Sequence, residues 1–432
     1  AHERGIRVIV DFVPNHTSDQ HPWFLDARSS RSSVDRDWYV WADPKPDGSP
    51  PNNWRSTFVR FGPAWTFDER SGQYYLHSFA PQQPDLNWWQ PQVRQAMDGV
   101  LRFWLDRGVD GFRIDVASMM ARDPELRDTP VLLDGVERPA TSDWPGVHDI
   151  LRGFRRTIDA YPNRMAVGEV WLSDVPAIAR YYGAHADELH LAFNFFFFFQ
   201  PWQASAFRAS VDAFEAALPP GDWPDCTLSN HDQSRPASRY DQHGLGQARA
   251  RLAAMMLLTL RGTPFLYYGE ELGMTDVPIP PDLARDPDGR DPYRTPMQWD
   301  ASAHAGFTSG RPWLPVAANA ATVNVTAERH DPASLLSLYR ALLHYRRTSE
   351  ALRRGAYQAL DAPDGIFAYL RQSGPECVLV VLNFENRPQR LDLSYIAAEA
   401  QLDVATDADR GQGALRLSAL HLGGHEGLVL RI

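Results

Sequence analysis

Cysteine is scarce in this sequence, which contains only Cys226 and Cys377 among its 432 residues. Disulfide-stabilised domains and cysteine-based metal sites need several cysteines at close spacings. Both cysteines lie instead in apolar, strand-like segments, where a thiol packs as a small apolar group. We therefore expect two buried free thiols without a redox role.

The sequence also lacks an excess of positive charge and any long apolar segment. Its formal net charge is -11, whereas proteins that bind nucleic acids concentrate Lys and Arg. The most apolar segments, residues 191–199 and 252–260, are too short to cross a bilayer. These absences argue against nucleic-acid and membrane partners, and we expect a soluble, cytoplasmic protein. With 44% hydrophobic residues, the chain can form one large domain and a smaller one.

Predicted strands and helices alternate along most of the chain. The strands are residues 6–13, 109–115, 164–170, 189–199, 225–229 and 263–269, and the helices are residues 91–108, 144–161, 206–218 and 246–260. The β-branched run at residues 6–13 is typical of a parallel strand buried on both faces, and we place the phenylalanines of residues 195–199 in the barrel core. Acidic residues recur where these strands end, so the pattern predicts an α/β fold, a (β/α)8 TIM barrel with its chemistry at one rim.

Only six strands of this kind are recognisable, whereas a closed barrel has eight. We therefore expect the first two βα units to be missing and the barrel to comprise residues 1–16 and 89–349. Residues 17–88 are too long for a plain connection and predict an inserted subdomain after the third barrel strand. A helix capped by Asp331 follows the last strand. From residue 350 to 432 a period of two predicts a C-terminal antiparallel β-sandwich domain.

The segment Gly111-Phe112-Arg113-Ile114-Asp115 brings a guanidinium next to a carboxyl group. Side chains two residues apart on a strand share a face, so Arg113 and Asp115 should point the same way. The neighbouring positive charge should keep the pKa of Asp115 low. Asp115 would then be a carboxylate, able to act as a nucleophile or as one half of a structural ion pair.

Two other acids follow later strands. Glu169 has no basic neighbour in its own strand, and burial near other acids should raise its pKa, which suits a general acid. Asp232, next to His231, could bind neighbouring hydroxyl groups of a sugar. A charged and a protonated carboxyl group on either side of one bond can cleave a glycosidic linkage. Each acid alone is also compatible with a capped or paired residue at a strand end.

Five motifs occur in a defined order, and they are Asp11-Phe12-Val13-Pro14-Asn15-His16, Gln83-Pro84-Asp85-Leu86-Asn87, Gly111-Phe112-Arg113-Ile114-Asp115, Gly168-Glu169-Val170 and Ser229-Asn230-His231-Asp232. This series resembles the α-amylase superfamily, glycoside hydrolase family 13. Within it, the sequence resembles the oligo-1,6-glucosidase and α-glucosidase branch more than the true α-amylases. That likeness comes from the form of the second motif, from Asn52-Asn53-Trp54-Arg55, and from Gly289-Arg290-Asp291 ahead of Arg294-Thr295-Pro296-Met297-Gln298-Trp299-Asp300.

The resemblance implies a retaining α-glucosidase that acts on short oligosaccharides. Asp115 would be the nucleophile, Glu169 the acid and base, and Asp232 a third acid that fixes the sugar at the cleaved bond. The other contacts to that sugar would come from His16, Arg113, His231 and Arg290, with Asp11 supporting Arg113. Val116 is similar to the residue of family members that accept α-1,6 links.

The resemblance implies no cofactor, and no metal site among these residues, because the calcium loop of the family would lie in the missing N-terminal part. Without that part we expect the fragment to be inactive. Two alternatives stay open. One is a glucosyl isomerase or transglucosidase of the trehalose synthase or sucrose isomerase type, and the other is a non-catalytic homologue. The second would have lost its carboxylates, whereas this sequence keeps all three.

Overall fold

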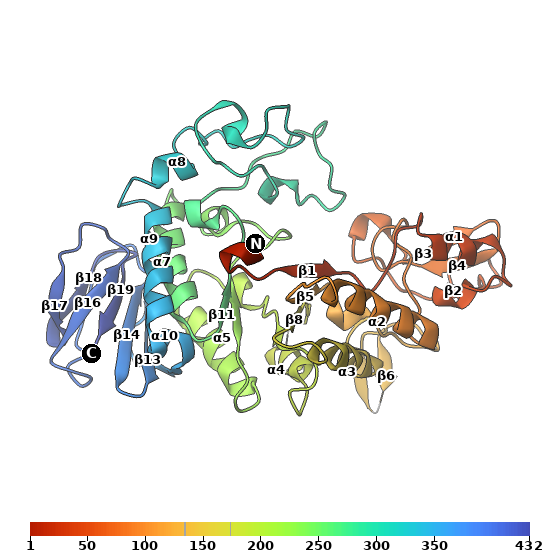
Figure 1. The fold of residues 1–432 in the computed structure, drawn as a ribbon, viewed down its shortest axis with the longest axis horizontal. Coiled ribbons are helices and arrows are strands. Elements are labelled where there is room, and N and C mark those ends of the chain that lie inside the picture. The colour runs from red at the N-terminus through yellow and green to blue at the C-terminus, as the bar shows by residue number, and fades with distance from the viewer. Residues whose placement is uncertain (134, 173) are drawn as a thin grey trace. The chain divides into compact units, whose positions relative to one another are not determined.

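The chain forms two compact units in a computed structural model that describes residues 1–133, 135–172 and 174–432. One unit comprises residues 1–193 and 219–222, and the other comprises residues 194–218 and 223–432. The fold of both units is drawn in Figure 1.

A four-stranded parallel sheet with the order β1-β5-β8-β9 is the centre of the first unit (Figure 1). Its strands are β1 (Ile9–Phe12), β5 (Gly111–Ile114), β8 (Met165–Gly168) and β9 (Leu191–Ala192). The helices of this unit are α1 (Pro22–Ser29), α2 (Pro91–Leu105), α3 (Gly146–Asp159) and α4 (Val175–Ala179). Proline begins α2 and its apolar side packs inward through Val93, Met97, Leu101 and Leu105, as its sequence pattern predicts.

Residues 17–88 contain a second, antiparallel sheet with the order β2-β4-β3. Its strands are β2 (Trp41–Ala42), β3 (Trp65–Asp68) and β4 (Gln73–Leu76), and a hairpin of β6 (Val131–Leu133) and β7 (Val136–Arg138) follows β5. The Asn52-Asn53-Trp54 motif joins the two regions, because Asn53 and Thr129 exchange two hydrogen bonds of 2.8 Å. The indole N–H of Trp54 also donates to the carbonyl of Arg127 at 2.8 Å.

The prediction that residues 6–13 form a strand buried on both faces is wrong. β1 covers only Ile9–Phe12, and of its four residues only Phe12 is buried. The reason is its position, since β1 lies at one edge of the sheet and pairs with β5 alone.

The second unit contains a two-stranded parallel sheet of β10 (Asp225–Thr227) and β11 (Thr263–Phe265). Its helices are α5 (Ala204–Ala217), α6 (Pro236–Arg239), α7 (Gly246–Thr259), α8 (Val325–Glu328), α9 (Leu335–Thr348) and α10 (Glu350–Arg354). The helix expected after Asp331 therefore begins later, and it is the hydroxyl of Ser334 that caps it by accepting the N–H of Ser337 at 3.1 Å.

The last part of the second unit is antiparallel, as the period of two predicts. A six-stranded sheet has the order β12-β13-β14-β19-β16-β17, and β15 pairs with β18. These strands are β12 (Ala356–Ala359), β13 (Ile366–Ser373), β14 (Glu376–Asn383), β15 (Gln389–Leu391), β16 (Glu399–Ala405), β17 (Gly413–Arg416), β18 (Leu420–Leu422) and β19 (Gly427–Arg431).

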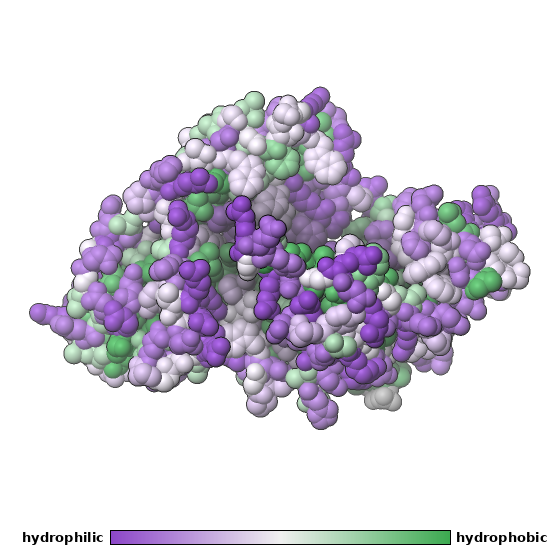
Figure 2. All heavy atoms as spheres, viewed as in Figure 1, coloured by the Kyte–Doolittle hydropathy of each residue, from purple (hydrophilic) through white to green (hydrophobic). Residues whose placement is uncertain are grey.

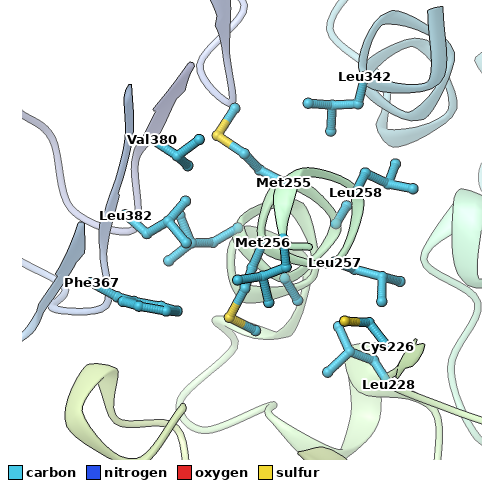
Figure 3. Close-up of a cluster of buried hydrophobic side chains, with 14 of the residues drawn as sticks. Cys226, Leu228, Met255, Met256, Leu257, Leu258, Leu342, Phe367, Val380 and Leu382 are labelled. Atoms are coloured by element: carbon cyan, nitrogen blue, oxygen red, sulfur yellow. The ribbon is translucent and has the colours of Figure 1, made fainter. Parts of the chain in front are cut away.

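One apolar core joins the helices of the second unit to this sheet. Met255 and Met256 of α7 lie among Phe367, Val380 and Leu382 of the sheet, as Figure 3 shows. On other sides, α7 packs against α9 through Leu342, against β10 through Cys226, and against Leu228 just after that strand. Burial of these side chains is the main source of stability in this unit.

The phenylalanines of residues 195–199 do not continue a strand, contrary to prediction. β9 ends at Ala192, and Phe197–Phe199 form a 3₁₀ helix. Phe195, Phe197 and Phe198 are buried, whereas Phe196 and Phe199 are 38% and 52% exposed. Consecutive side chains of a turning backbone point in different directions, so a continuous apolar run cannot all face one core.

Hydrophilic side chains cover most of the molecular face drawn in Figure 2. Among the described residues, no helix combines the length and the apolar character that crossing a membrane requires. Cys226 and Cys377 are free thiols, as predicted, although only Cys226 is fully buried.

The buried guanidinium of Arg371 closes the ends of two helices in the second unit. It donates to the carbonyl of Thr259 at 2.7 Å, and to the carbonyls of Leu352 and Gly355 at 3.1 and 2.9 Å. Arg371 is 0% exposed, and burial lowers its pKa to about 10. Thr259 and Leu352 are 0% exposed and Gly355 is buried, so these helix-end carbonyls depend on the guanidinium for a donor.

We expect Arg371→Met to lower the free energy of unfolding by about 3 kcal/mol or more, because it leaves buried carbonyl groups without a donor. Methionine keeps an apolar side chain of similar length, so the loss reports the hydrogen bonds. Thermal and denaturant unfolding of purified protein measure the effect. The matched control is Arg354→Met, since that side chain is 75% exposed and should change stability by less than about 0.5 kcal/mol. Equal stability of the two variants would contradict this account.

Candidate active site

Three neighbouring parallel strands of the first unit carry the predicted acids at one edge. Asp11 lies opposite Arg113 in the pairing of β1 with β5, and Arg113 lies opposite Val167 in the pairing of β5 with β8. Asp115 and Glu169 each follow the last residue of their strand. The carboxyl ends of parallel strands share one edge, and this edge is where barrels of this class carry their chemistry.

Backbone hydrogen bonds continue past the ends of these strands and fix both acids. The N–H of Asp115 donates to the carbonyl of Phe12 at 2.9 Å, and the N–H of Glu169 donates to the carbonyl of Ile114 at 2.8 Å. The strands approach so closely that a Cβ atom at Gly111 would lie 2.1 Å from the carbonyl oxygen of Met165. Glycine is therefore required at the start of β5.

The guanidinium of Arg113 binds all three acids. Its Nη1 donates to Asp11 Oδ1 at 2.8 Å and to Asp115 Oδ1 at 2.6 Å. Its Nη2 donates to Glu169 Oε2. The carboxyl groups of Asp115 and Glu169 therefore lie on the two terminal nitrogens of one guanidinium. The sequence predicted the contact between Arg113 and Asp115, but it gave no sign that Arg113 also reaches Glu169 from the neighbouring strand.

The pKa of Glu169 is raised to about 7, mainly by burial and further by the nearby charge of Asp115, although Arg113 acts in the opposite direction. This confirms the predicted direction. The prediction of a low pKa at Asp115 is wrong, because burial raises it and outweighs Arg113. The side chain of Asp115 is 19% exposed and that of Glu169 only 3%. Since burial disfavours the charged form, the proton is held more strongly by Glu169.

Trp171 is a contact of Glu169 that was not predicted from the sequence. Its indole N–H donates to Glu169 Oε1, so both oxygens of this carboxyl group accept hydrogen bonds. Trp171 follows Glu169 by two residues, and this is the same spacing that placed Arg113 beside Asp115. The spacing was therefore a usable signal.

His16 lies over a buried polar network in the first unit. The amide of Gln83 approaches Nε2 of His16 at 2.9 Å, and burial lowers the pKa of His16, which favours the neutral ring. Beneath it, Asp85 is 0% exposed and accepts from Asn15 at 3.0 Å and from Arg122 at 2.5 Å. The motif residues Asn15 and Asp85 thus have structural contacts, and Arg122 is a partner that the motifs did not identify.

In the second unit, Asp232 is bound by two arginines. Arg290 and Arg294 donate to its Oδ1 at 2.7 and 2.8 Å, and Nε2 of His231 lies 3.2 Å from its Oδ2. Nη2 of Arg290 also donates to Oδ1 of Asp286 at 2.7 Å. Burial alone would raise the pKa of Asp286, but the hydrogen bonds from Arg290 outweigh it and lower the pKa to about 2. The structure thus brings together the predicted residues Asp232, His231 and Arg290, and adds Arg294 and Asp286.

Glu270, which also follows a strand, has a different environment from the other acids. Its two oxygens accept hydrogen bonds from Ser229 and from Tyr339, and it is only 6% exposed. It is therefore an internal hydrogen-bonding group. Across residues 1–133, 135–172 and 174–432, no three His, Cys, Asp or Glu side chains are grouped so that they could hold a metal ion.

Parallel β/α units with one buried and one half-buried carboxyl group at adjacent strand ends fit the arrangement of a glycoside hydrolase. The chain belongs to the α-amylase family, glycoside hydrolase family 13. Residues 1–355 match the α-amylase catalytic domain, and residues 357–425 match the C-terminal domain of maltogenic amylase. The chain is therefore an enzyme of this family, with a catalytic domain of the TIM-barrel class and a C-terminal β domain.

Individual relatives agree with this assignment. The chain is 39% identical to a probable alpha-glucosidase of Rhizobium meliloti strain 1021, over 91% of the chain and 76% of that protein. It is 36% identical to an oligo-1,6-glucosidase of Parageobacillus thermoglucosidasius, over 89% of the chain and 76% of that protein. A solved structure of an alpha-glucosyl transfer enzyme matches with a TM-score of 0.91 and 35% identity, over all of the chain and 84% of that protein.

Proposed function

We propose that this enzyme is a retaining α-glucosidase, which removes terminal glucose from short oligosaccharides by cleaving α-1,4 bonds, α-1,6 bonds or both. The observation that carries the proposal is the pair of carboxyl groups of Asp115 and Glu169 on one guanidinium. One of the pair is the more exposed and the other is almost fully buried with a raised pKa. A retaining glycosidase needs this combination of an ionised and a protonated acid.

In the first step, a carboxylate oxygen of Asp115 forms a bond to C1 of the glucose as the glycosidic bond breaks. The proton of Glu169 passes to the departing oxygen. In the second step, a water molecule attacks C1, its proton passes to Glu169, and the bond to Asp115 breaks. Glucose leaves with its original α configuration, and both acids return to their starting states.

The remaining predicted residues have supporting parts in this proposal. Asp232 would bind hydroxyl groups of the same glucose, with its carboxylate fixed by Arg290. His16, His231, Arg113 and Arg290 would contribute further contacts to that sugar. Asp11 would support Arg113, to which it is hydrogen-bonded at 2.8 Å.

Glucosyl transfer is the second candidate function. A sugar hydroxyl could replace water in the second step, which would give transglucosylation or isomerisation without any change in the two acids. The match to an alpha-glucosyl transfer enzyme favours keeping this candidate. A non-catalytic homologue is disfavoured, because Asp115, Glu169 and Asp232 are all present.

Product analysis of the full-length protein with maltose, isomaltose, sucrose and trehalose tests the proposal. We expect glucose from at least one of the first two sugars, and proton NMR at early times should show α-glucose before mutarotation. Release of β-glucose first, or no glucose from any of these sugars, would contradict it. Rearranged or longer saccharides in place of glucose would instead support glucosyl transfer.

A further inference from the structure

Both carboxyl oxygens of Glu169 accept hydrogen bonds, one from a charged donor and the other from a neutral donor. Oε2 accepts from Nη2 of Arg113, and the N–H of Val116 lies 3.4 Å from the same oxygen. Oε1 accepts from the indole N–H of Trp171. An ionised carboxylate accepts on both oxygens, whereas a protonated carboxyl group donates from one of them, so two N–H donors favour the carboxylate form.

The hydrogen bond from Arg113 to Oε2 of Glu169 is firmly fixed. The guanidinium of Arg113 is anchored on Asp11 at 2.8 and 3.0 Å and on Asp115 at 2.6 Å. It also carries a permanent positive charge, which favours an unprotonated oxygen next to it. Oε1 is therefore the oxygen on which a proton can be taken up. Its partner Trp171 is half-buried, and an indole N–H can donate but cannot accept.

We propose that Trp171 is a positioning residue for the acid and base of this enzyme, whose N–H holds Oε1 of Glu169 when that group is a carboxylate. The proposal rests on the role of Glu169 given above. It also assigns Oε1 as the oxygen that carries the proton to and from the reacting sugar.

The consequences differ between the two steps of the reaction. In the first step the proton leaves Oε1 for the departing oxygen, and the new carboxylate gains the N–H of Trp171. In the second step water gives its proton back to Oε1, and the hydrogen bond weakens. Trp171 therefore stabilises the state of Glu169 that exists between the two steps, and it opposes the effect of burial.

The charged groups that face Glu169 are Arg113 and Asp115 on β5 and its end, with Asp11 on β1 beyond Arg113. None of them changes in Trp171→Phe, which keeps an aromatic ring and removes the N–H. A hydrogen bond to a charged group is worth enough to move a pKa by about one unit. We therefore expect Glu169 to titrate about one pH unit higher in this variant, and the alkaline limb of kcat/KM to move up with it.

Two measurements test this. The first is a ¹³C NMR titration of the Glu169 carboxyl carbon in protein labelled at glutamate, with the signal assigned by its absence in Glu169→Gln. The second is the pH profile of kcat/KM. Trp313→Phe is the matched control, since that indole is 70% exposed and its loss should leave both curves in place. If Trp171→Phe does not fold, a benzothiophene side chain at residue 171 replaces the N–H by sulfur and keeps the ring shape.

An unchanged titration of Glu169 in a folded variant without the N–H would overturn the proposal. A higher titration in that variant supports it, even if the wild-type protein releases no glucose from any glucoside. The NMR measurement needs no turnover, so failure of the proposed function and failure of this inference are separate results.

Discussion

In the full-length protein, Asp115→Ala should reduce kcat/KM for maltose and for aryl α-glucosides by at least about 10⁴-fold, since no carboxylate remains to bond to C1. The fold should persist. The backbone N–H of residue 115 still donates to the carbonyl of Phe12, and Arg113 keeps its contacts with Asp11 and Glu169. Circular dichroism and thermal unfolding verify this before the kinetic comparison.

Added azide should restore part of the activity that Asp115→Ala loses, which tests the role of Asp115 by a gain of turnover as well as by a loss. The anion fits the space that the carboxyl group leaves, and it attacks C1 from the face opposite the departing group. We expect azide to restore turnover of an activated aryl glucoside and to yield β-glucosyl azide. The control is Asp110→Ala, because Asp110 binds the N–H of Val8 at the opposite end of β5. That variant should keep most of the activity. If Asp115→Ala is as active as this control, Asp115 is not the nucleophile.

The strands that carry the site could be predicted because their signals are local. β1, β5 and β8 lie inside the predicted segments 6–13, 109–115 and 164–170, and each segment is a short β-branched or apolar run with an acid at or near its C-terminal end. α2 begins at Pro91, where proline fits the first turn. The failures concern burial. An apolar run indicates side chains that favour burial, but the elements packed around the run determine which of these side chains are buried. β1 at a sheet edge and the partly exposed Phe196 and Phe199 show this.

In the candidate site too, the local contacts could be predicted from the sequence and the long-range contacts could not. Two-residue spacing on one strand placed Arg113 beside Asp115, and the structure agrees. The contact of Arg113 with Glu169 joins residues that are 56 positions apart, and no local pattern contains it. The prediction of a low pKa for Asp115 was wrong for a related reason. The sequence showed the neighbouring charge of Arg113, whereas the burial that raises the pKa is determined only by the fold.

Glu169→Gln should separate substrates by their leaving groups. The variant cannot protonate the departing oxygen, so hydrolysis of maltose or isomaltose should fall by about 10²–10⁴-fold. The phenolate of an activated aryl glucoside can leave without a proton. The rate of the first step, measured as the burst of released phenol, should therefore change little. Equal losses on both substrates would remove Glu169 from the acid role.

The pH dependence sharpens this test. A carboxyl group whose pKa is raised to about 7 is protonated below that pH and loses its proton above it. Wild-type kcat/KM for maltose should therefore decline as pH rises through about 7, because the acid form disappears. Glutamine does not titrate, so the decline should be absent from the residual activity of Glu169→Gln. Azide should accelerate the second step of this variant, since an anion needs no general base. If the decline persisted in the variant, another group would supply the proton, and the pairing of Asp115 with Glu169 as nucleophile and acid would have to be abandoned.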